Sequence, residues 1–189
     1  MAIKIFVDQG HNPQNPNSGA EANGVREQDI TYDIGVRLAA LLEEDPRFEV
    51  RLSRNTPQEQ LGTSNASSLQ ARVYEANTWD ADYFISLHCN SSPNTAASGS
   101  EAYVYNETTP AYRLGEQILQ GISDMTGLAD RGVFVRPGLY VLRATSMPSV
   151  LVEMGYITNL NDVYLLTNDP QSFARGIYRG ILLYFGFAS

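Results

Sequence analysis

The chain has 189 residues, of which 43% are hydrophobic and 18% are charged, a composition typical of one globular domain with a substantial core. Thirteen Lys and Arg side chains against 21 Asp and Glu give a net charge of −8, which argues against a broad nucleic-acid-binding surface. A single cysteine excludes an internal disulfide, and no apolar run is long enough to cross a bilayer.

Short β-rich runs alternate along the chain with segments whose apolar residues recur at helical spacing. In chain order we predict strand 3–8, helix 27–44, strand 48–54, helix 67–79, strands 82–88 and 100–106, helix 111–127, strands 139–143 and 149–156, and helix 170–185. No linker or internal repeat interrupts this order. We therefore expect an α/β fold, a single domain over residues 1–189 with a mostly parallel twisted sheet covered by helices on both faces.

Both histidines of the chain and one glutamate stand near the ends of predicted strands. His11 follows the first strand, His88 closes the strand 82–88, and Glu153 lies late in the strand 149–156. Ligand sites in open α/β sheets lie outside the carboxyl ends of the strands, so these side chains should gather at one edge. A lone histidine after a strand is more often a hydrogen-bonded structural residue. Glu153, however, interrupts an apolar strand, where an unpartnered carboxylate is costly, and this indicates a cation or a catalytic role.

Glu27 opens the first predicted helix. It shares one helical face with Ile30, Ile34 and Leu38, so its carboxylate should point toward the sheet at the helix N-terminus, where the helix dipole favours an anion. Two histidines and one carboxylate with an open fourth position form a catalytic zinc set. A further carboxylate can carry protons between the activated water and a leaving nitrogen. The pattern favours a hydrolytic metal site, although the ligands are far apart and no HExxH motif is present.

Cys89 directly follows His88 and raises the alternative of a Cys–His nucleophile pair. Adjacent strand residues point to opposite faces of a sheet, so Cys89 should lie on the side of Ile85 and Leu87 as a packed thiol. The chain contains no G-x-S-x-G nucleophile elbow and no phosphate-binding glycine loop.

Several segments match, in order and spacing, the motifs of one known family. They are IFVDQGHN, GVREQDITYDIGVRLAALLEE, VRLSRNT, LQARVYEAN, ADYFISLHCNSS, SGSEAYVY, RGV and LVEMGYITNLND. At these segments the chain resembles the zinc-dependent N-acetylmuramoyl-L-alanine amidases of the amidase-3 type. The likeness covers nearly the whole chain, and ADYFISLHCNSS is its most specific part. The Asn- and Pro-rich loop after the first histidine and the cysteine after the second depart from the usual pattern.

The resemblance implies one zinc ion held by His11, Glu27 and His88, with Glu153 as the general acid and base. The substrate would be peptidoglycan, cut at the amide between the lactyl group of N-acetylmuramic acid and L-alanine. Two further residues are candidate substrate contacts. Asn90 would position substrate or a ligand, or else simply cap the strand end. Arg131 would meet a peptide carboxylate, although a solvated surface charge is the favoured interpretation.

Two other functions stay open at this stage. One is a zinc peptidase that cuts within the stem peptide, and the other is a catalytically silent wall-binding module, which the intact set of two histidines and two glutamates disfavours. We expect a monomer that acts on the cell wall, without a nucleic-acid partner or a membrane span. The apolar part of the first segment, MAIKIFVDQG, is too short for a signal peptide. Release would then follow another route, such as phage lysis or sporulation, unless the chain is a mature form.

Overall fold

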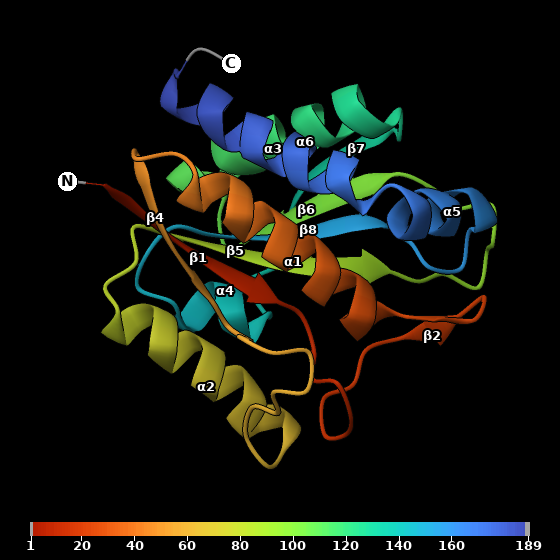
Figure 1. Ribbon diagram of the computed structural model, residues 1–189, viewed down its shortest axis with the longest axis horizontal. Coiled ribbons are helices and arrows are strands. Elements are labelled where there is room, and N and C mark those ends of the chain that lie inside the picture. The colour runs from red at the N-terminus through yellow and green to blue at the C-terminus, as the bar shows by residue number, and fades with distance from the viewer. Residues whose placement is uncertain (1, 188–189) are drawn as a thin grey trace.

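Six strands form the central sheet of the computed structural model, which describes residues 2–187 (Figure 1). The strands are β1 Ile3–Gln9, β4 Phe48–Leu52, β5 Tyr83–Asn90, β6 Ser100–Val104, β7 Asp130–Val135 and β8 Ser149–Tyr156. They lie in the order β4-β1-β5-β8-β6-β7. The first four of these are mutually parallel, β6 pairs antiparallel to β8, and β7 is parallel to β6. The starts of β6 and β7 therefore lie at the same edge as the carboxyl ends of β1, β5 and β8.

Helices cover both faces of the sheet, as the sequence predicts. They are α1 Glu27–Glu43, α2 Asn65–Thr78, α3 Pro110–Thr126, α4 Tyr140–Ala144, α5 Leu160–Asn168 and α6 Pro170–Phe185. Figure 1 shows α1, α3 and α6 on one face and α2 with α4 on the other. A short hairpin, β2 Glu21–Ala22 and β3 Val25–Arg26, precedes α1. No helix within residues 2–187 is both long and apolar enough to cross a membrane.

The alternation of side chains along β5 divides the core into two layers. Ile85, Leu87 and Cys89 belong to the larger cluster, which α1, α3 and α6 complete. Phe84 belongs to a smaller cluster that includes Phe6 and residues of α2 and α4. Each large apolar side chain buried in this way stabilises the fold by about 1.5–3 kcal/mol. By the same alternation His88 stands on the α2 side of the sheet, two residues before the strand ends and not at its last position.

The predicted strand 139–143 is wrong, because this segment forms the short helix α4. A short apolar run cannot be assigned to strand or helix by periodicity alone. Here the consecutive residues Val141 and Leu142 are both buried in the smaller cluster. Neighbouring residues can share one side of a helix, whereas in a strand they would point to opposite faces. The strand β7, the β2–β3 hairpin and α5 are not predicted from the sequence. The start of β7 is polar, so it does not show the pattern of a buried strand. In α5 the large apolar residues Leu160 and Tyr164 are exposed, so its apolar residues are not confined to one helical face.

Candidate metal centre

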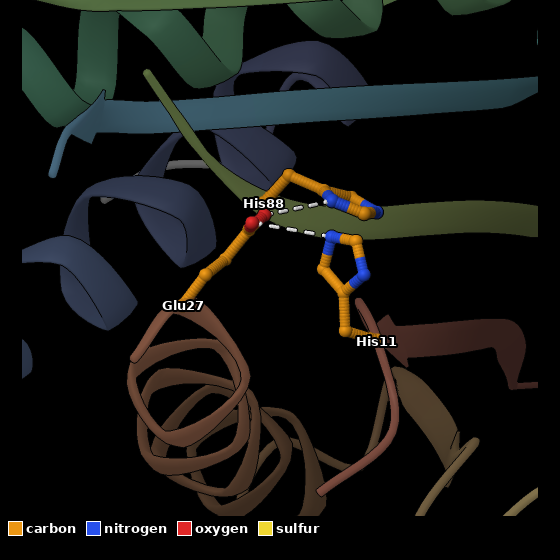
Figure 2. Close-up of side chains that lie close together, drawn as sticks. All are labelled: His11, Glu27 and His88. Atoms are coloured by element: carbon orange, nitrogen blue, oxygen red, sulfur yellow. Dashed lines mark hydrogen bonds and ion pairs between the residues drawn. The ribbon is translucent and has the colours of Figure 1, made fainter. Parts of the chain in front are cut away.

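Three side chains from distant parts of the chain meet at the carboxyl edge of the sheet (Figure 2). The Nε2 atom of His11 lies 3.2 Å from Oε2 of Glu27, and the Nδ1 atom of His88 lies 3.0 Å from Oε1 of the same carboxylate. The two imidazole rings meet edge to face, with their centroids 4.8 Å apart. One potential ligand atom from each residue lies within 4.8 Å of the other two. The structure thus brings together the three residues that the sequence singled out as metal ligands.

Glu27 is fixed by its position as the first residue of α1 and by backbone donors. It is buried, and its carboxylate accepts the backbone N–H of Cys89 at 2.9 Å and that of Ala20 at 3.0 Å. Burial by itself would raise the pKa of this carboxyl group. The hydrogen bonds and charges of His11 and His88 outweigh burial and hold the pKa of Glu27 well below its ordinary value. Glu27 is therefore a carboxylate ready to face a cation.

Two glycines allow this close packing of ligand side chains. A Cβ atom on Gly10 would lie 2.5 Å from Cε1 of the His88 ring, and one on Gly19 would lie 2.8 Å from Oε2 of Glu27. Neither position could carry a larger residue without moving a candidate ligand. The loop after β1 is thus shaped around the three side chains.

The donor set fits a divalent cation that accepts nitrogen and oxygen ligands. Two imidazole nitrogens and one carboxylate leave a coordination position open, as in catalytic zinc sites. The second ring nitrogen of His11, Nδ1, is buried and has no hydrogen-bond partner in the protein. Both oxygens of the Glu27 carboxylate face a histidine nitrogen, an arrangement that a shared cation fits.

Glu153 lies beside this cluster but outside it. In the sheet it is the neighbour of His88 on β5 and of Glu101 on β6, so the three side chains form a row on one face. Its Oε2 atom is buried and has no hydrogen-bond partner. Burial, assisted by the charges of Glu27 and Glu101, raises the pKa of Glu153 to about 8. A carboxyl group with one buried, unpartnered oxygen and a pKa near neutrality is suited to proton transfer.

Glu101 holds a polar network on the far side of Glu153. Its carboxylate accepts hydrogen bonds from Tyr103 at 2.8 Å and Tyr156 at 2.7 Å, and it pairs with Nε of Arg131 at 2.6 Å. Asn90 reaches toward it at 3.5 Å. Asn90 and Arg131, the two candidate substrate contacts, therefore lie next to Glu101 and not against the histidines. The Arg131 side chain is still 41% exposed, so it is neither a free surface charge nor a buried one.

Cys89 is a packed thiol, and its predicted orientation is confirmed. It is buried in the cluster on the α1 side, and burial raises the pKa of its thiol well above the ordinary value. Its contribution to the centre is the backbone N–H that Glu27 accepts. A Cys–His nucleophile pair is excluded by this geometry, since His88 lies on the opposite face of the sheet.

A hollow of about 120 Å³ adjoins the two histidines. Its lining includes Asp8 and Arg72 and several largely apolar side chains from α2, from α4 and the residue before it, and from β8. The site therefore combines a polar rim, formed by the ligands, with a small apolar recess on the α2 side.

Three buried polar residues escaped the sequence analysis, although two of them carried a signal. Asp8 stands in an apolar strand, as Glu153 does. Arg72 occupies the apolar face of α2 with Leu69, Val73 and Ala76, which is an unusual place for a charge. Glu101 offered no such signal, because nothing in its strand shows that β6 runs opposite to β8.

A family model described as "N-acetylmuramoyl-L-alanine amidase", Amidase_3, matches residues 5–182. The chain is 36% identical to the N-acetylmuramoyl-L-alanine amidase CwlM of Bacillus licheniformis over 187 residues, which cover 95% of the chain and 67% of CwlM. It is also 36% identical to the amidase LytC of Bacillus subtilis, with coverage of 96% of the chain and 35% of LytC. The chain thus spans about two thirds of the first relative and about a third of the second.

The fold has a solved counterpart. The catalytic domain of CwlV, an N-acetylmuramoyl-L-alanine amidase from Bacillus (Paenibacillus) polymyxa var. colistinus, superposes with a TM-score of 0.85. The sequences are 28% identical, and the match covers 98% of this chain and 99% of that domain.

Proposed function

The chain belongs to the Amidase_3 family of N-acetylmuramoyl-L-alanine amidases, and from this premise we propose that it hydrolyses peptidoglycan with a zinc ion held by His11, Glu27 and His88. The bond cut is the amide between the lactyl group of N-acetylmuramic acid and the L-alanine of the stem peptide. Zinc held there would supply Lewis acidity for the scissile carbonyl and would lower the pKa of the attacking water. The remaining chemistry belongs to the side chains of this chain.

Glu153 is the proposed general acid and base. Its carboxylate accepts a proton from the attacking water and then delivers a proton to the departing L-alanine nitrogen, which is too basic to leave as an anion. The observation that carries this proposal is its unpartnered buried oxygen, one strand away from the ligand His88. Other buried carboxylates nearby already accept hydrogen bonds, so Glu153 has the oxygen that is free to exchange a proton.

Substrate positioning is proposed for the two flanks of the centre. On one flank, Arg131 is held by Glu101 at the edge of the sheet, where its exposed donors can meet a carboxylate of the stem peptide. Asn90 lies on the same flank. On the other flank, the apolar recess beside His11 and His88 can take a small apolar group next to the scissile bond.

We further propose that residues 1–189 act as one catalytic domain, as a monomer, at the cell wall. The relatives named above are N-acetylmuramoyl-L-alanine amidases by their names, and the catalytic domain of CwlV matches nearly the whole chain. The net charge of −8 argues against a nucleic-acid partner.

Digestion of purified peptidoglycan tests the function. The amidase proposal expects new free amino groups on L-alanine and glycan strands released without peptide. New ends elsewhere in the stem peptide would support a zinc peptidase in its place, and zinc binding without any cleavage would support a silent wall-binding module. The Glu153→Gln variant serves as the control that keeps the fold but should release new ends about 10²–10⁴-fold more slowly.

A further inference from the structure

Arg72 is a charged residue with almost no exposure to solvent. Its side chain is 1% exposed and lies between α2 and the carboxyl end of β1. One guanidinium nitrogen, Nη1, contacts Oδ1 of Asp8 at 2.5 Å and the carbonyl oxygen of Gln9 at 2.6 Å. The other, Nη2, donates to the carbonyl oxygen of His11 at 2.6 Å. The side chain thus joins α2 to the loop that carries a candidate metal ligand.

His11 needs such support because its backbone is in an uncommon conformation. Its φ angle is 67°, in the left-handed region, which is unfavourable for a residue with a side chain. In this conformation the imidazole of His11 contacts Glu27. Some other interaction must therefore hold the peptide in place.

The contacts of Arg72 meet that need directly. The bond to the His11 carbonyl fixes the peptide plane that follows His11, and Asn12, whose Oδ1 lies 3.4 Å from Nη2, is itself held by the carbonyl oxygens of Pro16 and Leu61. Asp8 in turn accepts the hydroxyl of Ser86, so the guanidinium has a fixed counter-charge. The two Nη nitrogens of Arg72 therefore find acceptors in the backbone of the turn as well as in Asp8, whereas Nε has no partner, so the guanidinium is anchored chiefly to the turn that carries His11.

We propose that Arg72 is a positioning residue that sets the zinc affinity of the centre by holding His11 in its ligand geometry. The inference rests on the zinc site proposed above, and it concerns affinity and not the chemical step. Loss of a partner that orients a metal ligand typically weakens metal binding by about 10–100-fold. Lysine cannot replace arginine here, because a single ammonium group cannot reach Asp8 and the His11 carbonyl with the separated donors of a guanidinium.

The test is the zinc dissociation constant of Arg72→Lys, measured by competition with a chromophoric chelator. This variant keeps a positive charge beside Asp8 but loses the bond to His11. We expect zinc binding about 10–100-fold weaker than in the wild-type protein. The matched control is Val73→Ala, the adjacent buried residue of α2, which loosens core packing without touching the turn. Its zinc affinity should remain that of the wild type, even where its zinc-free melting temperature falls as far as that of Arg72→Lys.

Wild-type zinc affinity in Arg72→Lys would overturn the inference about Arg72 without contradicting the zinc site itself. An equal loss of zinc affinity in Arg72→Lys and in Val73→Ala would also overturn the inference, because the loss would then follow from looser packing. If Arg72→Lys does not fold, the double variant Asp8→Asn/Arg72→Met removes both buried charges together, a change that proteins often tolerate. It should show the same weakening of zinc binding, and wild-type affinity in this variant would refute the role of Arg72. A wild-type protein that binds no zinc would instead overturn the zinc proposal itself.

Discussion

The regions around Glu27 and Glu153 place the same type of residue at the same edge of the sheet but prepare it in opposite ways. Glu27 accepts two backbone N–H groups and contacts both histidine rings, and the pKa of its carboxyl group is lowered. Glu153 leaves one buried oxygen without a partner, and its pKa is raised to about 8. Burial raises the pKa of both carboxyl groups, so the difference comes from the histidines beside Glu27 and from the negative charges of Glu27 and Glu101 beside Glu153.

This difference separates holding a cation from moving a proton. A carboxylate that is already ionised and aligned can bind a metal without rearranging, whereas a carboxyl group with a free oxygen and a pKa near neutrality can gain and lose a proton during a reaction. The substitutions below change the two regions one at a time, in order from the largest expected effect to the smallest.

Removal of a ligand should abolish both metal binding and activity. His88→Ala deletes one of three donors, so we expect zinc content near zero and no hydrolysis, a greater loss than the roughly 10–100-fold expected for an orienting partner. Metal analysis of the purified variant checks this. The control is Glu107→Ala, which removes an exposed acid distant from the centre. Full zinc occupancy in His88→Ala would disprove the ligand assignment.

Glu153→Gln should separate the two regions. The amide keeps the shape of the side chain but cannot accept the proton, so zinc binding should be normal while the hydrolysis rate falls by about 10²–10⁴-fold. Zinc stoichiometry and the release of L-alanine amino groups are measured on the same sample. Joint loss of zinc and activity would make Glu153 a ligand, and a near-normal rate would place the general base elsewhere.

The raised pKa of Glu153 should also be visible in the stability of the zinc-free protein. Between pH 4.5, its ordinary pKa, and about 8, the folded state holds a proton on Glu153 that the unfolded state has released. The free energy of unfolding should therefore fall as pH rises through this range, by at most about 1.4 kcal/mol per pH unit. Below pH 4.5 this contribution is fully present.

Glu153→Gln carries no titrating proton at this position, so its stability should depend less steeply on pH. The measurement is denaturant unfolding of both proteins in excess chelator at pH 5, 6 and 7. Glu27 and Glu101 face Glu153 in both proteins, so their titration largely cancels in the comparison. Parallel curves for the two proteins would show that Glu153 is ionised in the folded state.

Cys89→Ala should have the smallest effect. The substitution removes a buried sulfur at a cost of about 1 kcal/mol in stability, similar to loss of a methyl group from a core. It retains the backbone N–H that Glu27 accepts, so zinc affinity and most of the hydrolytic activity should remain. A variant that folds and binds zinc but hydrolyses nothing would contradict this expectation.

The features that follow from local spacing could be predicted from the sequence. The inward direction of Glu27 follows from the helical face that it shares with Ile30 and Ile34, and the orientation of Cys89 follows from strand alternation. The unusual setting of Glu153 is visible as an acid within an apolar strand. These inferences need only the neighbours of each residue in the chain.

The features that depend on topology could not be predicted in the same way. Glu101 and Arg131 reach the candidate site because β6 and β7 run opposite to β8, and no local pattern specifies that reversal. The helix α4 was mistaken for a strand because its burial depends on packing against distant elements. Arg72 carried a readable signal on α2, but its partner His11 is 61 residues away.

The reversal of β6 has one further consequence, for the way in which new specificities can arise in this domain. The segment 91–99 connects the strand of His88 to the strand of Glu101, so it lies between the proposed metal ligands and the polar network of Arg131. Its end is held from outside by Asp162 of α5, which accepts the Ser98 hydroxyl at 2.6 Å. Insertions or replacements within this segment would therefore reshape the rim that meets the wall polymer while every strand kept its register. Changes in this segment could therefore alter which polymer is bound while the proposed catalytic residues stayed the same.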